Sequence, residues 1–164
     1  MKTLEDLFKY QIKNLFSAET QLLIALQEMA KTINDEKLTK IIENHFDESK
    51  KQKSRLEVIC REINISPSGD KCLAMKGIIK EAEKFRKQTA NNEVLDAGLI
   101  AIAQSIIHYE ISRYGTAVRY AKELGLKEIA EKLQETLDEE YNLNIKLNKI
   151  AENKINRKAL YTKK

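Results

Sequence analysis

The 164-residue chain contains little of what breaks a helix or cross-links a chain: one proline, five glycines, no tryptophan and two cysteines. Because proline and glycine mark turns, their scarcity favours a few long helices. With aromatic residues at only 6%, leucine, isoleucine and alanine must fill the core. Cys60 and Cys72 have no CxxC spacing, so we interpret them as buried, reduced thiols and not as a disulfide framework.

Long apolar runs and clustered charge are also absent. No apolar run approaches the length needed to span a membrane, and the first residues lack the apolar core of a signal peptide. The 29 basic and 25 acidic residues are interspersed, which is not typical of a dedicated nucleic-acid binder. No glycine-rich phosphate loop or Ser/His/Asp arrangement is discernible. The sequence therefore predicts a cytoplasmic protein without a membrane partner, and it argues against nucleic acid as the main partner.

Apolar residues recur at helical spacing along most of the chain and predict four long helices and one short one. Thr3 and Asp6 resemble a capping box at the first helix, and Asn91 or Asn92 could cap the third long helix. Gly125 is a good helix stop. The predicted helices cover residues 3–33, 36–64, 71–87, 93–123 and 126–153.

The lengths of the connections predict how these helices are joined. Short links join the first two long helices and the last two, so each pair should form an antiparallel hairpin. The segment around Pro67 ends the second helix, and about thirty residues, including the short helix, lead to the third long helix. One long crossover is typical of an all-α, ferritin-like four-helix bundle. We expect the bundle at residues 1–155 and a basic, disordered tail at 156–164.

Each of the four long helices carries one acid in its otherwise apolar stripe. Two of these acids lie about fourteen or fifteen residues on either side of the first hairpin turn, and the other two lie about fifteen residues on either side of Gly125. With a rise of about 1.5 Å per residue, the members of each pair face each other. Because the crossover makes the second and third long helices parallel, both pairs reach a similar depth. The four acids are Glu19, Glu48, Glu110 and Glu140.

His45 lies one turn before Glu48 and is predicted to point into the same layer. Buried carboxylates and imidazoles are costly unless they are paired, hydrogen-bonded or bound to metal. Two divalent cations would relieve the repulsion among the acids, and carboxylate-rich sites in bundles suit iron or manganese. Alternatively, some of the acids are protonated or paired with lysine or arginine. Three further residues could be weak oxygen ligands or hydrogen-bond the carboxylates: Gln52, Tyr114 and Asn144.

Five motifs follow one another along the chain: Leu15-Phe-Ser-Ala-Glu19, His45-x-x-Glu48-Ser49, Lys71-Cys72-Leu-Ala-Met75-Lys-Gly77, His108-Tyr-Glu110 with Tyr114-Gly115, and Thr136-Leu-Asp-Glu-Glu140. In this order they resemble the YciF-like family, bacterial ferritin-like proteins that are associated with stress responses. The resemblance covers nearly the whole chain to about residue 152. It implies a rubrerythrin-like four-helix core and a homodimer, and it implies no known reaction.

The ligand pattern differs from that of di-iron bundles, in which two helices each carry Glu-x-x-His. Here the second helix has the reversed order, His45-x-x-Glu48, and the last has Glu140-x-x-Leu143 with no histidine. Weak or partial metal binding therefore stays open.

Two hypotheses follow from these residues. In the first, Glu48 and Glu110 bridge two ions of iron or manganese, and Glu19 and Glu140 cap them. His45 supplies nitrogen, and the centre reacts with peroxide or oxygen as a stress-protective oxidase or peroxidase. In the second, the chain is a non-enzymatic bundle that works by protein association, which the reversed histidine motif favours. Nucleic-acid binding through lysine-rich faces is a weaker third reading, because acids are interspersed among the lysines.

Overall fold

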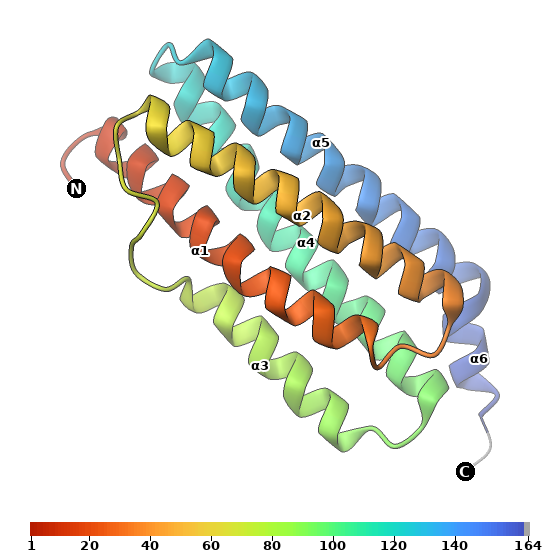
Figure 1. The fold of residues 1–164 in the computed structure, drawn as a ribbon. Helices are drawn as coiled ribbons and strands as arrows, with labels where there is room; N and C mark the ends of the chain where they lie inside the picture. The colour runs from red at the N-terminus through yellow and green to blue at the C-terminus, as the bar shows by residue number, and fades with distance from the viewer. Residues whose placement is uncertain (163–164) are drawn as a thin grey trace.

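The computed structural model describes residues 1–162, which are helical except at the connections (Figure 1). The helices are α1 (Leu4–Ala30), α2 (Glu36–Glu62), α3 (Leu73–Gln88), α4 (Asn92–Glu123) and α5 (Lys127–Ile150), followed by a π-helical turn (Ala151–Ile155) and α6 (Asn156–Leu160).

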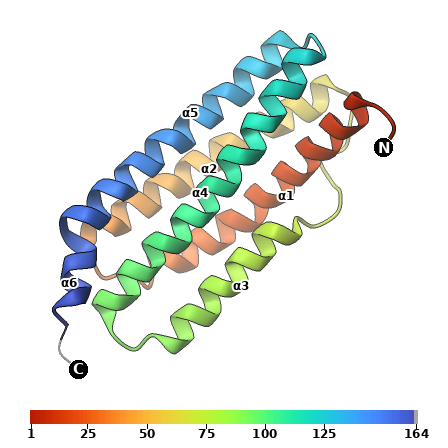
Figure 2. The ribbon, with the colours of Figure 1, turned by 180° about the vertical axis from the view of Figure 1, so that it is seen from behind.

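The helices are joined as the connection lengths predict. α1 and α2 form one antiparallel hairpin and α4 and α5 form the other, while the segment that contains α3 returns along the length of the bundle (Figures 1 and 2). α2 and α4 therefore run in the same direction. In the core α1 packs against α2 and α4, and α5 packs against the same two helices. The prediction of an all-α, ferritin-like four-helix bundle with one long crossover is confirmed.

The helix ends show the predicted local chemistry. The Thr3 side chain accepts a hydrogen bond from the Asp6 backbone, and the Asp6 side chain accepts one from the Thr3 backbone, so the capping box is present. Asn91 caps α4 through its side chain. Gly125 has a φ of 73° in the tight link between α4 and α5, a conformation that favours glycine.

The tail differs from its prediction, because the chain stays helical from Asn156 to Leu160. Lys154 and Lys158 form ion pairs of 2.8 and 3.2 Å with Asp35, the residue that caps α2. Ile155 is 1% exposed in the apolar core. The Lys158 contact holds the segment whose composition alone predicted disorder, and the contacts of Lys154 and Ile155 hold the π-helical turn that leads into it. The last two predicted tail residues, 163 and 164, lie outside the described residues.

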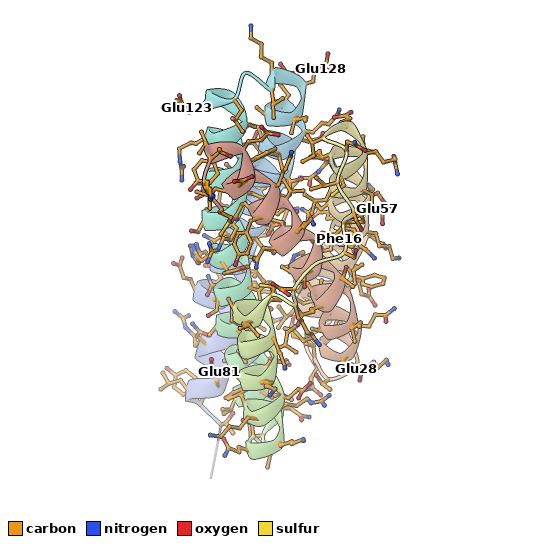
Figure 3. All side chains as sticks on the ribbon, turned by 90° about the vertical axis from the view of Figure 1, so that its left-hand side faces the viewer. Phe16, Glu28, Glu57, Glu81, Glu123 and Glu128 are labelled. Carbon is orange, nitrogen blue, oxygen red and sulfur yellow. The ribbon has the colours of Figure 1, made fainter. Side chains whose placement is uncertain are left out.

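α3 packs on the outside of the bundle, against α1 and α4 (Figures 1 and 3). Phe85 of α3 lies directly over Gly98 of α4, where an added Cβ would come within 2.0 Å of the Phe85 ring. The two helices therefore approach each other closely at Gly98. At Gly115 the nearest atoms lie 3.5 Å or more from such a Cβ, so that glycine is not required by packing.

The apolar core is divided into two clusters along the bundle axis. One includes Phe8, Ile12, Leu56 and Leu133, and the other includes Leu22. Glu19 follows Leu15 of the first cluster and precedes Leu22 of the second in the inward stripe of α1. A polar layer therefore lies between the two clusters, as the heights of the acids predicted. Most other acids are on the surface, such as Glu81, Glu123 and Glu128 (Figure 3).

α4 is long and apolar enough, by length and composition, to cross a membrane, with a window of mean hydropathy 1.3. This differs from the expectation that no segment reaches that length. In the structure α4 packs against α1, α3 and α5, and it carries the buried residues Asp96 and Glu110. A core helix that is covered on most sides has the same apolar composition as a membrane span.

Candidate metal centre

Four fully buried side chains, one from each long helix, form the polar layer. Glu19 comes from α1, His45 from α2, Glu110 from α4 and Glu140 from α5, and each is 0% exposed. Each occupies an inward position that an apolar residue would otherwise fill, because it lies on the stripe that its helix turns to the core.

Three of these residues direct their polar atoms to a common point. His45 Nε2 lies 3.9 Å from Glu110 Oε2 and 4.0 Å from Glu140 Oε2. One nitrogen or oxygen from each of the three lies within 4.8 Å of those from the other two, which is close enough to hold one metal ion.

Glu19 is held by a tyrosine in the same layer. The Tyr114 hydroxyl donates a hydrogen bond of 2.6 Å to Glu19 Oε1. Tyr114 is itself 0% exposed and follows Glu110 by one turn of α4. The prediction that Tyr114 hydrogen-bonds a carboxylate of the layer is confirmed.

Most polar atoms of the layer have no hydrogen-bond partner. These buried atoms are both ring nitrogens of His45, both carboxylate oxygens of Glu110, Oε2 of Glu19 and Oε2 of Glu140. Buried polar groups in proteins are nearly always satisfied, and an unsatisfied carboxylate is among the costliest. The donor set, oxygens with one imidazole, matches what iron and manganese accept in helical bundles. The residues present therefore fit a metal ion.

Burial and mutual repulsion shift the ionisation of the layer. Burial raises the pKa of Glu19 from 4.5 to about 7, against the lowering effect of the Tyr114 hydrogen bond. Burial, with the charge of Glu19, raises the pKa of Glu140 to about 8. Burial and the charges of both other acids raise the pKa of Glu110 well above its usual range. Burial lowers the pKa of His45 to about 4. Glu110 and Glu140 therefore favour their protonated forms at neutral pH and Glu19 is partly protonated, and a bound cation would replace these protons.

A hydrogen-bonded chain leads from this layer toward the surface between α2 and α5. Gln52 donates to Glu140 Oε1 at 2.8 Å and to Glu139 Oε2 at 3.0 Å. Arg55 donates to both carboxylate oxygens of Glu139, at 3.1 and 3.2 Å, and to Thr136 Oγ1 at 2.5 Å. Gln52 thus touches the layer through hydrogen bonds, while Oε1 of its amide has no partner.

The prediction that Glu48 belongs to the buried layer is wrong. Glu48 is half-buried, and the inward positions of α2 next to His45 are Ile42, Ser49 and Gln52. Helical spacing fits the stripe through Glu48 and the stripe through Ser49 almost equally, because both pass through His45 and Gln52. The packing of α2 against α1 and α5 selects the second stripe.

The remaining residues considered from the sequence, Asn144 and the two cysteines, lie outside the group of His45, Glu110 and Glu140. Asn144 is half-buried and its Oδ1 atom has no partner, whereas Leu143 takes the buried position on α5. Cys60 and Cys72 are buried and free, as predicted, and the Cys72 thiol contacts the Tyr109 hydroxyl at 3.0 Å.

Sequence reasoning missed three residues that border the layer: Ser49, Arg55 and Glu139. For Ser49 the sequence did contain a signal. From Leu38 to Ile59 the inward residues of α2 alternate in steps of four and three residues, and this alternation passes through position 49 and not 48. For the pair of Arg55 and Glu139 there was none, because the two residues lie on different helices and meet only through packing.

Comparison with known proteins identifies the group to which this chain belongs. The family model of DUF892, described as a domain of unknown function, matches residues 3–160. The chain belongs to the DUF892 family. Within it, the chain is 42% identical over 160 residues to Protein YciF of Escherichia coli strain K12, covering 97% of this chain and 96% of that protein. The predicted resemblance to the YciF-like family is confirmed.

Solved structures support this DUF892 assignment. The crystal structure of the E. coli stress protein YciF matches with a TM-score of 0.91 and 41% identity, covering 96% of this chain and 99% of that chain. YcfI from Rhodopseudomonas palustris matches with a TM-score of 0.88 and 38% identity, covering 90% and 94%. A protein from Xanthomonas campestris, 18% identical, shows the same fold with a TM-score of 0.74 and 92% of both chains covered.

Proposed function

We propose that this protein binds iron or manganese in the buried layer and uses the metal in a stress-protective reaction with peroxide or oxygen. The observation that carries the proposal is the convergence of His45, Glu110 and Glu140, whose ligand atoms lie within 4.8 Å of one another and largely lack partners. The description of the relative YciF as a stress protein is consistent with such a role.

In this proposal His45, Glu110 and Glu140 hold the first ion. Glu110 is the acid whose pKa is raised by the charges of both Glu19 and Glu140 and by hydrogen bonding to them, and apart from these acids neither of its oxygens has a hydrogen-bond partner among the described residues. It is therefore the carboxylate best placed to bridge to a second ion, with Glu19 as the remaining acid. Bound iron or manganese would supply one-electron redox chemistry toward a small oxidant. The apolar clusters on either side exclude bulk water from the layer.

Elemental analysis of protein purified without chelator tests the proposal. We expect near-stoichiometric iron or manganese, at about two ions per chain if Glu110 bridges. The E110Q variant should lose most of it, whereas E131Q, which removes an exposed acid from α5, should keep it. A content of one ion per chain would contradict only the bridging role of Glu110 and would leave metal binding itself intact. Protein that neither retains metal nor binds added Fe(II) would contradict the proposal.

The raised pKa values favour a specific second candidate. Because Glu19 and Glu140 titrate at about 7 and 8, the layer can be neutral without metal, and the chain could act as a non-enzymatic bundle that associates with other proteins. This candidate predicts metal-free protein that does not consume peroxide. The homodimer and the cytoplasmic location stay predictions in both readings.

A further inference from the structure

A second group of charged residues lies outside the buried layer, where α2 packs against α5. We call this region the α2–α5 seam. It consists of the charged residues Glu48, Arg55, Glu135 and Glu139 and of the buried, neutral Gln52 beneath them. Of the neighbouring pairs of core helices, α2 and α5 make the fewest contacts. The opposite side, where α1 packs against α4, is covered in addition by α3, and within the described residues no additional helix packs across both α2 and α5 in this way.

Glu139 connects the seam directly to the layer. Its side chain is 25% exposed, so one part of it meets solvent. Its Oε2 atom shares the Gln52 amide with Glu140, at 3.0 and 2.8 Å. A single neutral side chain, Gln52, thus separates an acid at the surface from a ligand acid that is fully buried. The unpartnered Oε1 atom of Gln52 adds a buried oxygen at this step.

Arg55 restrains this outer acid and has another partner available. It binds both oxygens of Glu139 and also forms an ion pair of 2.7 Å with Glu135, whose side chain is 62% exposed. Arg55 can therefore leave Glu139 and keep an anionic partner at the surface. Without Arg55, Glu139 is an uncompensated anion beside the layer, which attracts cations.

Glu48 adds negative charge at the same place. It is half-buried on α2, and burial together with the charge of Glu139 raises its pKa, against the attraction of Lys146. Its charge also contributes to the raised pKa of Glu140. The acid that the sequence assigned to the metal layer thus lies beside the path that leads to it.

We propose that divalent cations enter the buried layer through the α2–α5 seam, with Glu48 and Glu139 attracting the ion at the mouth and Arg55 acting as a latch on Glu139. The Gln52 amide, whose NH2 group bonds both acids and whose Oε1 atom has no partner, then turns so that Oε1 takes up the ion and passes it to Glu140. This inference rests on the proposed metal binding and deepens it, because it assigns residues that control how fast metal arrives and not how much is held.

Time-resolved uptake of Mn(II) tests the route. Full-length protein is stripped with EDTA, mixed with Mn(II), quenched with EDTA at intervals, desalted and measured for bound manganese. We expect E139Q and E48Q to take up Mn(II) more slowly, for E139Q by on the order of tenfold, since charge at a mouth raises on-rates by this order. R55Q should take it up several-fold faster. All three should reach the wild-type content after long incubation.

The controls separate the route from the metal site. E131Q removes the same charge from an exposed position on α5 and should show the wild-type rate. Wild-type rates in E139Q, E48Q and R55Q, with full final content, would overturn the route and leave metal binding intact. A lower final content in E139Q would make Glu139 a ligand and overturn its role at the mouth. Wild-type protein that holds no manganese at any time, and no iron when Fe(II) replaces Mn(II) in the same assay without oxygen, would instead refute the proposed function. Glu48 is half-buried on α2, so E48Q should disturb the fold little. Its uptake rate therefore still tests the route if E139Q folds poorly.

Discussion

At the scale of single residues, the hydroxyl of Tyr114 decides how Glu19 is held. Glu19 has one oxygen bound by this hydroxyl at 2.6 Å and one without a partner. The hydrogen bond opposes the burial that raises the pKa of Glu19. It therefore stabilises the layer and keeps Glu19 closer to ionisation at neutral pH.

The Y114F variant should lower the free energy of unfolding by about 1–2 kcal/mol, because it leaves a buried carboxylate oxygen unpaired. Urea denaturation at pH 7 measures the effect. Y10F, which removes the hydroxyl of a tyrosine that is 46% exposed, should change it little. Equal stability of Y114F and wild type would show that this hydrogen bond contributes nothing to the fold.

At the scale of elements, the packing of α3 against α4 depends on the absence of a side chain at Gly98. Phe85 occupies the space that a Cβ at position 98 would need. The crossover helix α3 therefore makes a close contact with α4 at Gly98, whereas Gly77 of α3 has open space around it.

We expect G98A to destabilise the protein by about 1–3 kcal/mol through overpacking. G77A, in the exposed middle of α3, should instead be neutral or stabilising by up to about 1 kcal/mol, since alanine is the better helix former. Thermal and urea unfolding of both variants measure the difference, and G98A/F85A should recover part of the loss. A G98A protein as stable as G77A would contradict the close packing.

At the scale of the whole molecule, the burial of two apolar clusters offsets the free-energy cost of burying a polar layer between them. The raised pKa values of Glu19, Glu110 and Glu140 mean that the folded protein binds more protons than the unfolded chain above pH 4.5. These groups contribute stability that is fully present below pH 4.5. The contributions of Glu19 and Glu140 are lost as the pH rises through about 7 and 8, and that of Glu110 is lost as the pH rises through its own raised pKa. His45 acts in the opposite sense, because its lowered pKa removes stability as the pH falls from 6.5 to about 4.

Chelator-treated protein should therefore lose stability between pH 6.5 and 8.5, by on the order of 2 kcal/mol. His45 stays neutral throughout this window, so the acids dominate. Urea midpoints at several pH values measure the slope, which should be shallower in E140Q and unchanged in E131Q. Stability that is constant or rises with pH would show that the acids are ionised in the folded protein. Bound Mn(II) should oppose the loss, because the ion replaces the protons.

The sequence by itself determined the helices, their ends and the level at which polar residues meet. Periodicity selected Glu19, His45, Glu110 and Glu140 as inward residues, together with Glu48. Counting from the two turns brought the four acids to one depth, because rise per residue is constant in a helix. The capping box at Thr3 and the helix stop at Gly125 could likewise be predicted from the sequence, since each depends on local backbone chemistry.

Only the tertiary structure decided between Glu48 and Ser49, which lie on adjacent stripes of α2 that share His45 and Gln52. The rotation of a helix about its axis is set by the neighbours against which it packs, and these are distant in sequence. The same reason applies to Arg55 and Glu139, whose contact joins α2 to α5. It applies as well to α6 and the π-helical turn before it, where Lys158, Lys154 and Ile155 find partners that the sequence does not place beside them.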